Sequence, residues 1–69
     1  MVFRKVHLVG GPLNGQVKLF QIVSGERMGE VMYFKDKAEV GVLYVYKNRE
    51  PGLMSSRDTW ADYSHNLSN

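Results

Sequence analysis

Apolar and polar residues alternate with a period of two along most of this chain, and glycine-rich turns interrupt that alternation at short intervals. Successive side chains of a β-strand point to opposite faces of a sheet, so the pattern predicts strands. We expect four of them, at residues 2–9, 16–23, 28–35 and 39–47. A mainly β fold follows.

Two local features predict that the sheet curves. The second strand carries apolar residues on both faces, and Gly41 interrupts the fourth, where glycine is typical of a bulge or bend. Asn14-Gly15 before the second strand is a strong hairpin signal, because both residues tolerate positive φ. The favoured fold is a small antiparallel barrel or meander, SH3-like, of four to five strands. The alternative is a twisted four-stranded sheet with a helix across one face.

The C-terminal segment has a different character. Ser55 followed by Asp58 resembles a helix capping box, so the segment either forms a short helix or adds a fifth strand over residues 59–64. We expect one domain over residues 1–64 and a frayed tail over residues 65–69.

Short length and missing cysteine limit what the chain can build. With 69 residues and no cysteine, it has a thin core and neither disulfides nor thiolate metal sites. Its two histidines cannot complete a zinc site without carboxylates. We therefore expect no metal and no cofactor, and a thin core favours a homodimer. No secretory signal and no membrane-length apolar run is visible, so a cytoplasmic location is expected.

No catalytic constellation is legible. The Gly10–Gly15 loop could bind phosphate through its N–H groups, but it leads into a strand rather than a helix, which favours a structural turn. Asp58, Asp62 and His65 would share one face of a C-terminal helix, yet a solvated face explains them better. His7 is a lone strand histidine. We expect no enzyme.

Aromatic residues suggest binding instead. Tyr33, Phe34, Tyr44 and Tyr46 lie on two strands that we expect to pair as a hairpin. They either fill the core, form a stacking platform for nucleic acid with the nearby lysines Lys35 and Lys47, or form a protein-binding face. Trp60 and Tyr63 stand in the polar tail and either dock it or contact a partner. The candidate partner-binding residues are Tyr44, Tyr46, Arg49, Arg57, Trp60 and Tyr63.

The opening strand, the turn Gly10-Gly11-Pro12-Leu13-Asn14-Gly15 and the later tyrosine strand at residues 43–46 together carry a resemblance. They resemble small uncharacterised bacteriophage proteins that have a strand followed by Gly-Gly-Pro-Leu-Asp-Gly. Asn14 stands where aspartate is common in those proteins, and both residues suit the turn. The resemblance covers residues 5–47. It implies a phage or prophage origin and a role inside the infected cell, and it carries over no catalytic residue.

The leading functional hypothesis is therefore a phage-encoded accessory protein that binds a host protein and inhibits or redirects it. The first alternative is a nucleic-acid-binding protein that uses an aromatic and basic sheet face. The second is a sponge for a small anionic nucleotide signal, held by glycine-rich loops. A virion component is a further alternative.

Overall fold

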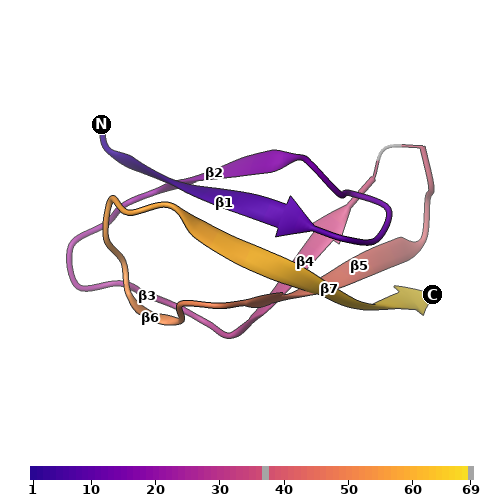
Figure 1. Cartoon of the computed structure of the whole chain (residues 1–69). Helices are drawn as coiled ribbons and strands as arrows, with labels where there is room; N and C mark the ends of the chain where they lie inside the picture. Colours follow the sequence, from indigo (N-terminus) through magenta and orange to yellow (C-terminus); the bar gives the residue numbers. More distant parts are fainter. Residues whose placement is uncertain (37, 69) are drawn as a thin grey trace.

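The computed structural model describes residues 1–36 and 38–68, and throughout these residues the regular structure is β-strand, without a helix. The strands are β1 (Phe3–Val9), β2 (Val17–Gln21), β3 (Arg27–Met28), β4 (Val31–Lys35), β5 (Val42–Asn48), β6 (Gly52–Leu53) and β7 (Thr59–Ser68). Five of them form one curled sheet, a half-barrel, in the order β2-β1-β7-β5-β4 (Figure 1). The remaining two, β3 and β6, pair with each other. The predicted mainly β fold is confirmed.

One strand pair departs from the antiparallel sheet that the sequence predicts. The pairs β1–β2, β4–β5 and β5–β7 are antiparallel, but β1 and β7 run side by side in the same direction (Figure 1). Val6 lies opposite Thr59, and Val9 lies opposite Asp62. The first and last strands of the chain are therefore neighbours in the middle of the sheet.

The C-terminal segment is a strand, so the helix alternative is wrong. β7 has β1 on one side and β5 on the other, and these ladders satisfy backbone groups that a helix would bond internally. The frayed tail is also wrong for residues 65–68, because His65 pairs with Val45 and Ser68 pairs with Val42. Residue 69 lies outside the described residues. The capping pattern at Ser55 did not produce a helix, because the residues after it pair with the distant strands β1 and β5.

The core lies on the concave side of the curled sheet. Its buried apolar side chains come from every strand of the large sheet except β2, from the turn after β1 and from β3: Val6, Leu8, Leu13, Met28, Met32, Tyr44, Tyr46 and Ala61. Phe20 of β2 packs against this cluster while half-buried. Arg4 alternates along β1 with the same parity as Val6 and Leu8, so it shares their strand face, and it is buried there.

Arg4 is held inside by three neighbours. Its Nε donates to the Arg57 carbonyl at 3.0 Å, and its Nη2 donates to the Glu50 carboxylate at 3.3 Å. Its Nη1 points at the Met28 sulfur, 3.5 Å away. Because a buried charge is costly unless it is paired, these contacts explain how a guanidinium can occupy the interior.

Tyr46 ties the Gly10–Gly15 turn to the core. Its hydroxyl donates to the Gly10 carbonyl at 2.6 Å and accepts the Leu13 N–H at 3.1 Å. These two bonds fix the position of Leu13, which is buried in the core. The bulge expected at Gly41 lies instead between Val45 and Tyr46, and Gly41 precedes β5 with a φ of +85°.

Replacing Tyr46 with Phe removes the hydroxyl and leaves the buried Leu13 N–H without its acceptor. We expect the free energy of unfolding to fall by about 1–3 kcal/mol, measured by urea denaturation. The matched control is Tyr33→Phe, whose hydroxyl is on a side chain that is 59% exposed and which should change stability little. Equal effects of the two substitutions would contradict this role of Tyr46.

Gly11→Ala should destabilise the protein more than Gly15→Ala. Both glycines have positive φ, +65° and +87°, so the backbone strain is shared. A Cβ at position 11 would overlap the Tyr63 ring, whereas a Cβ at position 15 meets nothing within 4 Å. A lower melting temperature for Gly11→Ala than for Gly15→Ala is the expected result, and the reverse order would refute the tight packing of Tyr63 on the turn.

Candidate functional site

The sheet ends at two strands, β2 and β4, each of which has a partner on one side within the described chain. Along an antiparallel pair, hydrogen-bonded residues alternate with residues whose backbone groups point outward. Leu8 donates to Gln16 and Ile22 donates to Val2, which assigns the even-numbered residues of β2 to the bonds with β1. The backbone N–H and C=O groups of Val17, Leu19 and Gln21 therefore face away from the sheet.

The same reasoning applies to β4. Asn48 donates to the Glu30 carbonyl at 2.7 Å, so the even-numbered residues of β4 bond to β5. The backbone groups of Val31, Tyr33 and Lys35 then point outward. We call the opening between these two edges the seam.

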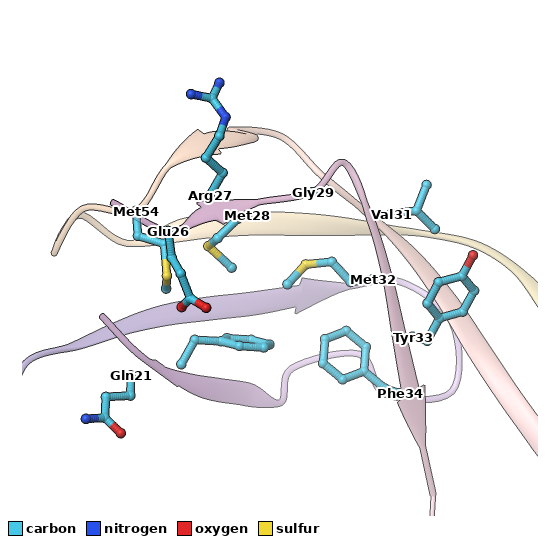
Figure 2. A pocket seen from close by; sticks show the side chains of 11 residues that line it. Gln21, Glu26, Arg27, Met28, Gly29, Val31, Met32, Tyr33, Phe34 and Met54 are labelled. Atoms are coloured by element: carbon cyan, nitrogen blue, oxygen red, sulfur yellow. The ribbon is translucent and has the colours of Figure 1, made fainter. Parts of the chain in front are cut away.

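An apolar groove of about 500 Å³ lies beneath the seam. Its floor consists of Phe20, Met28, Met32, Phe34 and Met54. Figure 2 shows Met28, Met32 and Phe34 turned into the groove, while Val31 and Tyr33 point away from it. The Phe20 and Phe34 rings meet edge to face with centroids 6.3 Å apart, so side chains rather than backbone bonds bridge the two edges. Methionines adapt easily to different shapes, which suits a floor that receives a ligand.

Both edges expose apolar side chains next to their free backbone groups. On β2, Val17 is 46% and Leu19 is 61% exposed; on β4, Val31 is 43% and Tyr33 is 59% exposed. Edge strands usually discourage pairing with charged residues, bulges or a covering loop. An edge that combines free backbone groups with apolar side chains favours the addition of another strand.

Two of the sequence-predicted binding residues lie in the core. Tyr44 is 1% and Tyr46 is 0% exposed, so neither offers a surface to a partner, and that part of the prediction is wrong. Both point to the concave side of β5 because aromatic area is what a small core needs. The stacking platform for nucleic acid therefore lacks these two tyrosines.

The other four predicted residues do not form one surface. Trp60 lies on the convex face of β7 and stacks on His7, with ring centroids 4.9 Å apart. Tyr63 is half-buried against Tyr46, 5.5 Å between centroids. Arg49 and Arg57 are exposed and are each bound to a carboxylate.

Asp58, Asp62 and His65, for which a solvated face was favoured over a functional cluster, do not come together in the structure. Asp58 contacts His7 at 2.9 Å, and Asp62 accepts two bonds from Arg49 at 2.6 and 2.7 Å. The bonds from Arg49 hold the pKa of Asp62 below its usual value. His65 contacts Ser64 instead. In the described ranges, no three histidine or carboxylate side chains gather around a point where a metal ion could sit.

The Gly10–Gly15 loop has few N–H groups left for an anion. Gly10 donates to the Asn14 side chain, and Leu13 donates to Tyr46. Asn14 and Gly15 donate to backbone carbonyls. Because Pro12 has no N–H, these bonds make the loop a closed structural turn, as the sequence favoured.

The seam itself was missed at the level of sequence. The available signal was the presence of apolar residues on both faces of residues 16–23. It does not reveal that β2 and β4 end the sheet, because that depends on which distant strands pair.

No family model, no curated protein and no solved structure matches this chain. Residues 1–36 and 38–68 contain no helix that is long and apolar enough to cross a membrane.

The Tyr44 hydroxyl donates to the Glu39 carboxylate at 2.7 Å. This bond, together with burial and the nearby negative charge, raises the pKa of Tyr44 to about 12. Glu39→Gln should bring that pKa back toward 10, measured by ultraviolet titration of tyrosinate or by NMR. Because the folded-state pKa is raised, the stabilisation is complete below pH 10 and is lost between pH 10 and about 12. Identical titrations for the wild type and Glu39→Gln would contradict the bond.

Proposed function

We propose that this protein is a non-enzymatic binding module that takes up an extended segment of another protein as an added strand at the seam. The observation that carries the proposal is the pair of free strand edges above an apolar groove. Added strands gain affinity from backbone hydrogen bonds and specificity from pockets that receive alternate side chains. The seam offers both features.

The apolar border supports the same reading. An incoming strand would cover parts of Leu19 and Tyr33, which are more than half exposed, and would set side chains against Phe20 and Phe34 below. Burial of apolar surface contributes roughly 25 cal/mol per Å², so even a short segment has a useful driving force.

We further propose that the partner is a host protein and that the chain is a phage-encoded accessory protein acting in the host cytoplasm. The support for this origin is the resemblance of the turn Gly10–Gly15 and the tyrosine strand to small bacteriophage proteins. A captured strand that the partner needs for its own contacts would inhibit or redirect that partner.

The other hypotheses have weaker support at this site. The stacking platform for nucleic acid relied on Tyr44 and Tyr46, which are buried. The nucleotide sponge relied on N–H groups of the Gly10–Gly15 loop that already donate within the turn. A homodimer remains a proposal, and it would use the seam if a second copy supplied the added strand.

The test compares Leu19→Pro with Leu19→Ala. Proline removes the outward N–H of Leu19 without breaking a bond to β1, whereas alanine removes the side chain and keeps the N–H. Peptides selected against the wild type from a random displayed library serve as probes in calorimetric titrations. Leu19→Pro should weaken binding about tenfold, and Leu19→Ala considerably less.

Both variants must first show a folded circular dichroism spectrum and a cooperative melt. If the selected peptides bind Leu19→Pro as tightly as they bind the wild type, strand addition at β2 is wrong. A selection that yields no binding peptide would count against the proposal as a whole.

A further inference from the structure

The seam carries opposite charges at its two ends, and this polarity indicates what kind of strand it accepts. Building on the function proposed above, we infer that the added strand has a central apolar residue with a basic residue on one side and an acidic residue on the other. The carboxylate would lie near Lys18 and the cation near Glu26.

Lys18 marks the cationic end. It is on β2, points toward the concave side and is half-buried, with its ammonium 5.8 Å from the centroid of the Phe34 ring. Within the described ranges no carboxylate oxygen lies within 4 Å of it, unlike Arg4, Arg49 and Arg57. A partly desolvated cation of this kind gains more from a carboxylate than a fully exposed lysine does.

Glu26 marks the anionic end. It lies in the connection after β2 and lines the groove together with Gln21 and Met54. Figure 2 shows its side chain beside Met54 and directed toward the other residues that line the groove, while Arg27 points away from them. No salt bridge to Glu26 occurs in the part of the chain that the structure describes.

The spacing of the two ends fits a short strand. Lys18 and Gln21 are three residues apart on β2, which is about 10 Å, and Glu26 lies beyond Gln21. Side chains on one face of a strand recur at every second residue, so charges at positions i and i+4 would bracket an apolar residue at i+2. That central residue would lie over Phe20 and Phe34.

Two end-capped peptides of identical composition test the inference: Thr-Lys-Thr-Leu-Thr-Glu-Thr and its reverse, Thr-Glu-Thr-Leu-Thr-Lys-Thr. The inference requires that the strand binds in one direction. The wild type should then prefer one peptide about tenfold in Kd, because in that direction the other places like charges together at both ends. The preferred order reports the direction of the bound strand. Amide shift changes at Leu19 and Tyr33 show that binding occurs at the seam.

Exchanging the two protein charges should reverse the preference. The double variant Lys18→Glu, Glu26→Lys keeps the net charge and should prefer the peptide that the wild type rejects. Its matched control is Lys5→Glu, Glu30→Lys, which makes the same exchange at two exposed residues, neither of which is placed over Phe34 or lines the groove, and which should keep the wild-type order. Lys18→Met, which retains an apolar stem over Phe34, should lose most of the preference.

The outcomes separate this inference from the function on which it rests. Equal binding of both peptides at the seam, or an unchanged preference in the double variant, overturns the charge inference and leaves strand addition standing. If library-selected peptides bind and neither designed peptide does, the charge inference is also overturned and strand addition stands. That result is expected if Lys18 only discourages pairing at the β2 edge. Self-association through the seam, seen by sedimentation, would identify a second copy as the occupant and overturn the inference. If no peptide from either source binds, the proposed function fails.

Discussion

The parallel pairing of β1 with β7 holds the two halves of this molecule together. One half is the β1–β2 hairpin, and the other is the antiparallel set β4–β5–β7; in the described residues the ladder from Val6–Val9 to Thr59–Asp62 is the backbone connection between them in the large sheet. A buried side chain reinforces it, since Arg4 of β1 donates to the Arg57 carbonyl just before β7. Inside the antiparallel half, Thr59 of β7 donates to the Asn48 side chain of β5 at 2.8 Å.

This arrangement determines where the sheet is open. Because the first and last strands occupy the middle, β2 and β4 become the edges, and the sheet curls until Phe20 and Phe34 touch across the seam. A small domain buries a limited share of its surface, and here part of the exposed apolar surface lies at these edges, on Val17, Leu19, Val31 and Tyr33. The curled sheet thus has unpaired backbone groups at its two edges, and an apolar groove floor beneath them that a partner could contact.

Local pattern was sufficient to predict a mainly β chain, the Gly10–Gly15 turn and the pairing of β4 with β5 as a hairpin. The register of that hairpin, in which Tyr33 lies opposite Val45, was not predicted. The burial of Arg4 was not predicted, because its carboxylate partner, Glu50, is 46 residues away in the sequence. The C-terminal strand was misjudged because its stability comes from two neighbours rather than from its own residues. Tyr44 and Tyr46 were misassigned to a binding surface because the alternation does not reveal which face of β5 is concave.

Amide hydrogen exchange of the free protein, followed residue by residue by NMR, tests the open seam most directly. The account predicts alternation along both edges: the amides of Leu19 and Tyr33 exchange rapidly, while those of Phe20 and Phe34, bonded to β1 and β5, are protected. Uniformly slow exchange along β2 and β4 would contradict it, because those edges would then already be covered.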